Sequence, residues 1–339
     1  MKKILFIVSL LFLVIFVSGC TTQKELTIND YYPFKENVRY VYEGIGNEYA
    51  GNDVFVDYVE DNRIQLRSNN GGTEETKVLE NKDGQLTMLL SRAECYYREN
   101  LIQSAQSPGS EVEILLKEPL KQGTTWTLAD NRKRTITNIG VEITTPLGKY
   151  ETLEVTTEGE GYKTLDYYAI NVGLVKSVYV ADELEVSTSL SKIETNVPLT
   201  QTVKFYYPNV NEDKLYFVNK QLSFNTNDIT RDFIEKEYKE LPIGDVGKVL
   251  GPNVTIKSLY LNQDNVVYVD FTDELVSEMN AGSGYESMIL QSITNTLGTY
   301  YGVDKVYITI EGSPYSSGHI IMEKGEPFIV NLENCVELK

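Results

Sequence analysis

Short runs of alternating apolar and polar residues fill the chain from residue 31 to about residue 194. Such alternation is typical of strands with one buried face, and closely spaced turn signals such as Asp61-Asn62 indicate antiparallel pairing of neighbours. No helical stripe of any length interrupts the pattern, although Gly140 and Pro146-Leu147-Gly148 break it. We predict an antiparallel sandwich or half-barrel with strands at Val38–Tyr42, Val54–Val59, Ile64–Arg67, Lys77–Leu79, Gln85–Leu90, Glu111–Leu116, Thr125–Leu128, Arg134–Ile139, Val141–Thr145, Lys149–Thr156, Leu165–Ala169, Leu174–Val180 and Glu185–Ser191.

The pattern changes after Thr195–Thr200, where proline and small polar residues interrupt the strands. A first helix is predicted to follow Asn227-Asp228 and to stop at Pro242, because its apolar residues recur with a period of 3.6. A second is expected to begin with a capping box, Ser283 as N-cap and Glu286 reaching back, and to end at Gly302. Strands at Thr202–Tyr207, Lys257–Leu261, Val266–Asp270 and Val306–Ile310 complete an α+β domain with a mostly antiparallel sheet covered by helices on one face.

The N-terminus has the form of a targeting signal. A short positive start, Met1-Lys2-Lys3, precedes the apolar run Ile4–Val17 and then Val17-Ser18-Gly19-Cys20. This arrangement is typical of a secretory signal peptide, and the run is short for a transmembrane helix. Val-Ser-Gly-Cys resembles the bacterial lipobox, which implies that the Cys20 thiol receives a diacylglycerol and becomes the new N-terminus. The alternative is an uncleaved signal anchor with an incidental cysteine.

The charge balance excludes some classes of partner. The 339 residues carry 31 Lys and Arg against 49 Asp and Glu, a net charge of −18. A surface this acidic repels phosphate backbones, so we expect no nucleic-acid ligand. The single histidine, His319, excludes sites that need two histidine ligands and argues against a zinc enzyme or a Ser-His-Asp hydrolase. We expect no cofactor and no metal.

The candidate reactive residues are few. Cys95 and Cys335 are a candidate disulfide outside the membrane, and two unpaired buried thiols are the alternative. Asp270, Asp273 and Glu274 cluster after a strand, where they would act as acid and base, bind a hard cation, or simply begin a helix. His319, in a Ser- and Gly-rich loop, is interpreted as an exposed loop residue. No catalytic residue is assigned.

Tyrosines occur in pairs, and strand geometry gives each pair one inward and one outward ring. The outward rings would either contact a partner or be ordinary half-buried strand residues. The pairs are Tyr31-Tyr32, Tyr96-Tyr97, Tyr167-Tyr168, Tyr206-Tyr207 and Tyr300-Tyr301.

The C-terminal half carries a recognisable succession of motifs. Phe205-Tyr206-Tyr207 opens it, Val269-Asp270-Phe271-Thr272 and Gly282-Ser283 form its centre, and Asn295-Thr296-Leu297 and Glu311-Gly312 follow. Together these resemble the GerMN domain family of spore germination proteins, over about residues 200 to 325, in one copy. The resemblance implies an envelope role in sporulation or germination through protein–protein contacts, and it implies no catalytic residues.

The leading hypothesis is a non-enzymatic lipoprotein, extracytoplasmic and anchored by Cys20 to the outer face of the cytoplasmic membrane, that acts as a scaffold for an envelope protein partner. The alternative is a ligand-binding lipoprotein whose N-terminal β domain holds a peptidoglycan fragment or a lipid, and a hydrolase is a third. The expected organisation is a signal peptide (1–19), a tether (20–30), a β domain (31–194), a linker (195–201), a GerMN-like domain (202–325) and a C-terminal tail (326–339).

Overall fold

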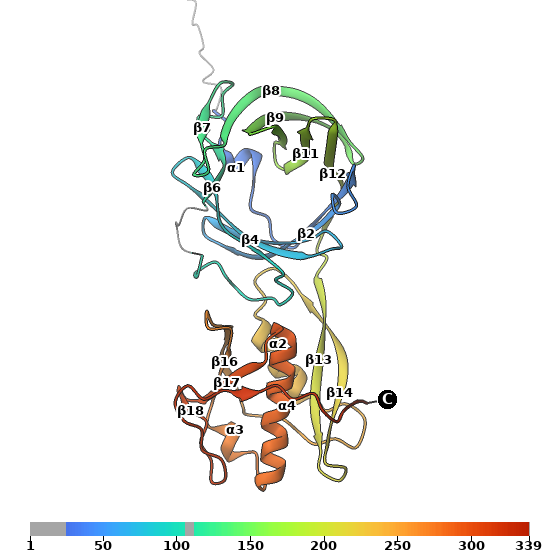
Figure 1. Ribbon diagram of the computed structural model, residues 1–339, viewed down its shortest axis with the longest axis vertical. Coiled ribbons are helices and arrows are strands. Elements are labelled where there is room, and N and C mark those ends of the chain that lie inside the picture. The colour runs from blue at the N-terminus through green and yellow to red at the C-terminus, as the bar shows by residue number, and fades with distance from the viewer. Residues whose placement is uncertain (1–24, 106–111, 339) are drawn as a thin grey trace, which may run out of the picture.

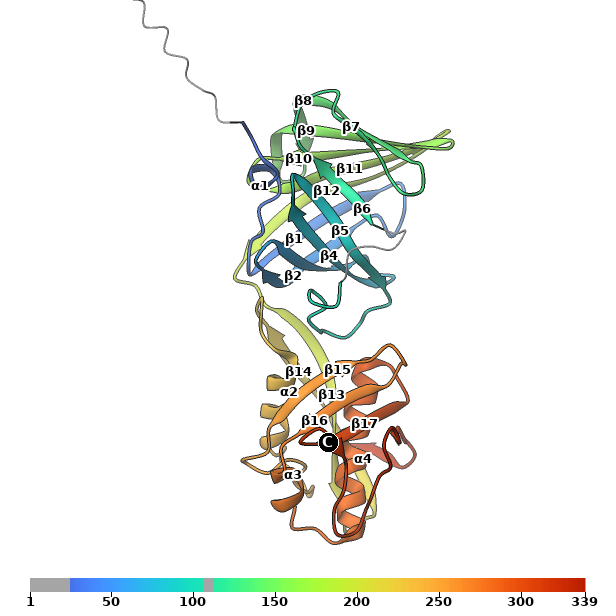
Figure 2. The same cartoon turned by 90° about the vertical axis from the view of Figure 1, so that its left-hand side faces the viewer.

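The computed structural model describes residues 25–105 and 112–338. The molecule is elongated, and two parts are stacked along its long axis (Figure 1, Figure 2). We call residues 25–195 the N-terminal part and residues 199–338 the C-terminal part. The predicted signal peptide and Cys20 lie outside the described residues.

The N-terminal part is one antiparallel sheet in which almost every strand pairs with the strand before and after it. The described strands follow the order β6-β5-β4-β3-β2-β1-β12-β11-β10-β9-β8-β7, and the β1–β12 pairing joins the two ends of the segment. Their bounds are β1 Val38–Ile45, β2 Asn52–Glu60, β3 Arg63–Asn69, β4 Glu74–Lys82, β5 Gln85–Ala93, β6 Glu113–Lys117, β7 Thr125–Thr127, β8 Lys133–Thr145, β9 Gly148–Gly159, β10 Tyr162–Ala169, β11 Gly173–Ala181 and β12 Leu184–Thr195.

This sheet curls until its two edge strands, β6 and β7, come together (Figure 1). Side chains bridge the edges: Trp126 Nε1 donates to Ile114 O at 3.0 Å, and Arg134 Nη1 donates to the same oxygen at 2.6 Å. The mainly β prediction is confirmed, and of its two forms the half-barrel is the one observed. The predicted break at Gly140 is a bulge inside β8, where Gly140 has a φ of +79°.

A short helix, α1 (Ile28–Tyr31), precedes the sheet and packs against its concave side. Ile28 and Tyr31 are buried in one core with Leu66, Leu86 and Leu153. The end of the segment expected to be a tether is therefore part of the folded core.

The C-terminal part combines two small sheets with helices between and beside them. The order is β13-β14-β20 in one sheet and β15-β16-β17-β18 in the other, with β19 paired to β17. The strands are β13 Leu199–Asn209, β14 Lys214–Phe224, β15 Ile256–Leu261, β16 Val267–Phe271, β17 Lys305–Ile310, β18 Ser313–Pro314, β19 Phe328–Ile329 and β20 Cys335–Glu337, and the helices are α2 Thr230–Lys239, α3 Glu274–Ser277 and α4 Ser283–Tyr301.

The predicted α+β class is confirmed. Strands β16 and β17 run parallel because α4 returns the chain between them, whereas the other pairs of their sheet are antiparallel. Helix α4 packs on β13 and on β17, so its buried residues Ile293 and Leu297 join the core that also contains Phe205 and Val267.

The predicted capping box is wrong. Gly282 is the N-cap of α4 and makes no side-chain cap bond. Glu286 is only 3% exposed and faces the core, where it accepts a hydrogen bond from Tyr315 Oη at 2.8 Å and another from Ser317 Oγ. Gly302 ends the helix in the left-handed conformation, as expected. No described helix has both the length and the apolar character that a membrane span requires.

Candidate functional site

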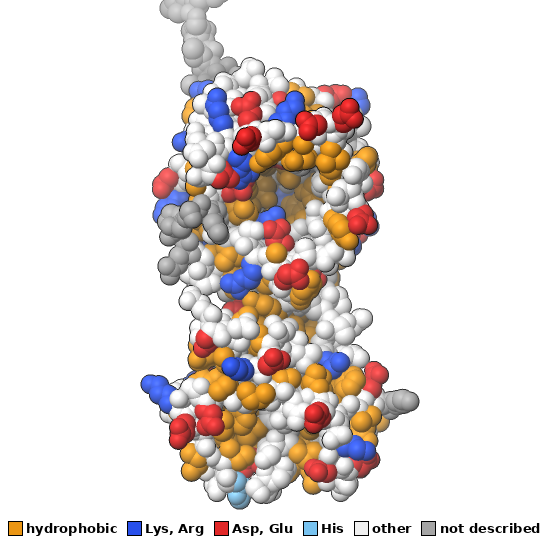
Figure 3. All heavy atoms as spheres, in the orientation of Figure 1, with side chains coloured by type: hydrophobic (Ala, Val, Ile, Leu, Met, Phe, Trp, Pro, Cys, Tyr) orange, Lys and Arg blue, Asp and Glu red, His pale blue; other side chains and the backbone are white. Residues whose placement is uncertain are grey.

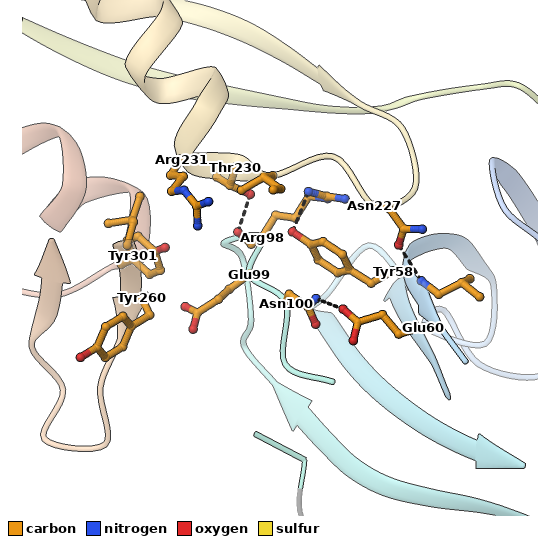
Figure 4. Close-up of a pocket in the computed structure, with 13 residues that line it drawn as sticks. Tyr58, Glu60, Arg98, Glu99, Asn100, Asn227, Thr230, Arg231, Tyr260 and Tyr301 are labelled. Carbon is orange, nitrogen blue, oxygen red and sulfur yellow. Dashed lines mark hydrogen bonds between the residues drawn. The ribbon is translucent and has the colours of Figure 1, made fainter. Parts of the chain in front are cut away.

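The connection between β5 and β6 belongs to both parts of the molecule. Cys95 and Tyr97 are buried in the core of the C-terminal part, whereas Leu101 and Ile102 pack with Tyr58 on the N-terminal sheet. The chain therefore passes from one core into the other and back, and Arg98 lies at the crossing point (Figure 4).

Arg98 links the two parts through nearly all of its polar atoms. Its guanidinium donates to Asp57 O at 2.8 Å and to Tyr58 Oη at 2.8 Å in the N-terminal part. It also donates to Asn225 O at 3.1 Å and to Asp228 O in the C-terminal part. Tyr58 and Phe224 place ring faces 4.2 and 4.9 Å from its central carbon, close enough for cation–π attraction.

A second buried arginine shares the carboxylate that faces Arg98. Arg67 lies 3.1 Å from Asp57 Oδ2 and 3.0 Å from Glu74 Oε2, and the Arg98 Nε lies 3.5 Å from Asp57 Oδ1. Burial is the largest single influence and acts to lower the pKa of Arg67, but the nearby Asp57, Cys95 and Glu74 together outweigh it and the pKa is raised. The two arginines thus face the two carboxylates of Asp57 and Glu74. This pairing offsets the free-energy cost of burying the charges.

The segment after β14 docks on the N-terminal part through hydrogen bonds between side chains and backbone groups. Thr226 Oγ1 donates to Val56 O at 2.8 Å, and Asn227 Oδ1 accepts from Val59 N at 2.8 Å. Asn37 and Thr226 exchange two further bonds of 2.8 and 2.9 Å. These bonds fix the two parts in one relative orientation.

We call the contact between the two parts, built by Arg98, Asp57 and Thr226, the joint. Beside the joint lies a cleft of about 410 Å³. Its walls come from the end of β2, the segment that begins at Arg98, the start of α2, strand β15 and the end of α4 (Figure 4). The volume falls within the range of small-ligand pockets. The lining residues are Tyr58, Val59, Glu60, Arg98, Glu99, Asn100, Asn227, Ile229, Thr230, Arg231, Leu259, Tyr260 and Tyr301.

Glu99 is a half-buried acid of the cleft. Burial raises its pKa from 4.5 to about 7, although the backbone N–H of Leu261 and the charge of Arg92 act in the opposite direction. The Leu261 N–H donates to Glu99 Oε2 at 3.0 Å. Glu60, the other acid, accepts from Asn100 Nδ2 at 2.5 Å and from Gln103 Nε2 at 2.6 Å. The cleft therefore presents a half-buried carboxyl that titrates near neutral pH.

The acids singled out in the sequence are held in structural roles. Asp270 Oδ1 accepts from Thr309 Oγ1 at 2.6 Å and from Gly312 N at 2.8 Å, so it ties β16 to the end of β17. Asp273 is the N-cap of α3 and Glu274 lies in its first turn. His319 is exposed in its loop. Within residues 25–105 and 112–338, no group of three or more His, Cys, Asp or Glu side chains is placed to hold a metal ion.

The structure does not join Cys95 to Cys335. Both are free thiols: Cys95 is buried beside Tyr97 O, and Cys335 is half-buried beside Asn295. The candidate disulfide would have joined the N-terminal part to the C-terminal tail. Buried side chains around Arg98 connect the two parts instead.

The sequence interpretation missed Asp57, Arg67, Arg98 and Glu99. One signal was present, since Asp57 interrupts the apolar run Val54–Val59 in a strand that is otherwise suited to burial. A charge in such a run has a partner when it is buried. The identity of that partner depends on contacts between distant segments, which spacing does not show.

Comparison with known proteins identifies one region. Residues 204–316 match the family Germane, described as sporulation and spore germination. The predicted GerMN-like domain is thereby confirmed over those residues. None of the curated proteins matches the sequence.

Solved structures show weaker likenesses. The tandem GerMN domains of the sporulation protein GerM from Bacillus subtilis are 20% identical, with a TM-score of 0.27 over 37% of this chain and 45% of that one. The first GerMN domain alone is 23% identical, with a TM-score of 0.27 over 36% of this chain and 94% of that one. A protein described as a lipoprotein, from Parabacteroides distasonis, is 16% identical, with a TM-score of 0.29 over 47% and 96%. The chain spans less than half of the tandem-domain structure, and these scores carry no functional argument.

Proposed function

We propose that this chain is an envelope lipoprotein that serves sporulation or spore germination as a non-catalytic protein-interaction module. The observation that carries the proposal is the Germane match over residues 204–316. The lipobox-like Val17-Ser18-Gly19-Cys20 supports attachment through a diacylglycerol on Cys20, which would place both folded parts outside the cytoplasmic membrane. The partner would be another envelope protein.

The joint between the two parts supports this role. A scaffold has to hold its contact surfaces in fixed positions, and the buried bonds of Arg98 and Thr226 resist relative movement of the parts. The described chain begins on the N-terminal part. An anchor ahead of it would therefore hold the N-terminal part nearer the membrane and present the C-terminal part to partners.

The test combines a deletion of the gene with a Cys20→Ala variant in the host bacterium. We expect the deletion to lower the yield of heat-resistant or germinating spores. The Cys20→Ala protein should lose both metabolic labelling by fatty acid and recovery with membranes. In-cell crosslinking during vegetative growth and sporulation should capture a discrete envelope protein that the variant no longer captures. Normal sporulation and germination of the deletion strain would remove the basis of the proposal.

A second candidate function is binding of a lipid or peptidoglycan fragment in the N-terminal part. One observation favours it: the curled sheet encloses a hollow whose walls expose apolar side chains (Figure 3). A cavity among Tyr32, Tyr40 and Tyr42 on this side measures only about 30 Å³, which is far below the usual size of a ligand pocket. Saturable binding of a muropeptide or phospholipid to the purified protein would favour this candidate.

A further inference from the structure

Strand β15 is the end strand of its sheet, and its free edge faces the cleft beside Arg98. The register of β15 with β16 shows which backbone groups point outward. Hydrogen-bonded and non-hydrogen-bonded pairs alternate along an antiparallel ladder. The N–H of Leu261 is taken by Glu99, so the pair Leu261–Val267 is non-hydrogen-bonded and the pair Leu259–Val269 is as well. The N–H and C=O of Leu259 therefore point into the cleft.

Carboxylates cover the β15 edge on both sides of this open position. Ile256 N donates to Glu235 Oε2 at 2.8 Å, and Leu261 N donates to Glu99 Oε2 at 3.0 Å. Each carboxylate oxygen occupies the place that a carbonyl of a further strand would take. Between them, no described residue accepts from Leu259 N or donates to Leu259 O. An edge with one open donor and acceptor, lying in a cleft, is suited to an extended peptide.

The charges and rings of the cleft indicate which peptide fits. The Nη1 and Nη2 groups of Arg98 already donate to groups of the joint. Among the described residues, no cation lies at salt-bridge distance from the Glu99 carboxyl. Tyr260 is 41% exposed next to it and stacks on Tyr268 with ring centres 5.6 Å apart. A lysine or arginine side chain placed there would neutralise Glu99 and lie against an aromatic face. The net charge of −18 favours a basic partner as well.

We propose that this cleft binds an extended, basic segment of a partner protein, which adds a strand at Leu259 and places a Lys or Arg side chain against Glu99. The inference rests on the proposed interaction function and names the site and chemistry of its partner. Arg231, at the start of α2, would face an acidic group or the C-terminal carboxylate of the same segment.

The test uses the purified mature protein and a synthetic peptide, acetyl-Thr-Val-Thr-Lys-Thr-Val-Thr-amide, followed by amide NMR shifts. We expect saturable shifts centred on Leu259. A peptide with Glu in place of Lys should bind about tenfold more weakly, which corresponds to about 1.4 kcal/mol. In Glu99→Gln this preference for Lys should disappear. The matched control is Glu235→Gln, because Glu235 also accepts a β15 N–H but does not line the cleft.

A Leu259→Pro variant tests the strand pairing. Proline at this position removes an N–H that points away from β16, so the ladder keeps its bonds and circular dichroism should be unchanged. Binding of the lysine peptide should be lost. The proposal is overturned if the lysine peptide causes no saturable shift at Leu259 up to its solubility limit, if Glu and Lys peptides bind equally, or if lysine amide alone reproduces the shifts. If the peptide fails but deletion of the gene still impairs sporulation, the proposed function stands and this site is wrong.

Discussion

The two parts of the molecule treat their sheet edges differently. In the N-terminal part the edge strands β6 and β7 face each other along a seam. Trp126 and Arg134 both donate to Ile114 O across this seam. In the C-terminal part β15 keeps the N–H and C=O of Leu259 open, in a cleft of about 410 Å³. Natural sheets usually cover or blunt an edge because it invites pairing. The difference teaches that the first sheet is built to close on itself and the second to accept another strand.

The largest expected effect concerns the joint that holds these two sheets together. Asp57→Ala would leave the buried cations of Arg67 and Arg98 without their shared carboxylate. Breaking a buried ion pair from one side costs about 3–5 kcal/mol of unfolding free energy. Trp126 is the sole tryptophan, so its fluorescence reports urea unfolding of the N-terminal part, while circular dichroism reports both parts. We expect one coincident transition in the wild type and two separated transitions in the variant.

Asp53→Ala is the matched control for Asp57→Ala. Asp53 also pairs with an arginine, Arg39 at 2.6 Å, but its side chain is 37% exposed. A pair this exposed contributes about 1 kcal/mol or less. A stability of Asp57→Ala equal to that of Asp53→Ala would show that the buried charges do not hold the joint.

The ease of prediction differs between the two parts for a physical reason. In the N-terminal part almost every strand pairs with its neighbour in sequence, so alternation and turn signals suffice to place the strands. Sheet curvature brings β1 to β12 and β6 to β7. The alternation of apolar and polar residues does not indicate that curvature. In the C-terminal part the parallel pairing of β16 and β17 follows from the position of α4. Glu286 satisfied a local capping pattern, yet tertiary contacts with Tyr315 and Ser317 decided its place.

The candidate site was less predictable than the fold. Its lining comes from five separate segments, represented by Glu60, Glu99, Arg231, Tyr260 and Tyr301. None of these residues is unusual in its own neighbourhood along the chain. Their significance comes from burial, and burial arises only when the two parts dock. Sequence motifs identified the GerMN-like region, whereas the cleft that we propose as a contact surface required the structure.

The second prediction concerns the free energy of unfolding, which should depend on pH through Glu99 at the open edge of β15. Burial raises the pKa of Glu99 to about 7 from 4.5. Between these values the folded protein binds more protons than the unfolded chain, so the contribution of Glu99 to stability is complete below pH 4.5 and is lost as the pH rises through 7. The loss is about 3 kcal/mol, at 1.36 kcal/mol per pKa unit.

Glu99→Gln keeps an oxygen for the Leu261 N–H and removes the titration. Urea unfolding at pH 4.5 and pH 8 should therefore show a smaller loss of stability in Glu99→Gln than in the wild type. Glu235→Gln, which also alters an acceptor of a β15 N–H, should retain the wild-type loss because Glu99 is still present. An equal pH dependence in Glu99→Gln and the wild type would place the titrating group elsewhere.

The smallest expected effect tests the closed edge itself. Trp126→Phe keeps a buried aromatic ring but removes the Nε1–H that donates to Ile114 O. Because Arg134 Nη1 still donates to that oxygen, no buried acceptor is left unpaired, and the cost is about 1 kcal/mol. Amide hydrogen exchange in β6 and β7 should become about fivefold faster, while exchange in β15 should not change.

The same exchange measurement on the wild type tests the open position of β15 directly. Leu261 N–H, held by Glu99, should be protected, whereas Leu259 N–H, two residues earlier on the same strand, should exchange as an open amide. If Leu259 is as protected as Leu261, the edge of β15 is already covered in the free protein, and the contrast between a sheet that closes and a sheet that receives a partner fails.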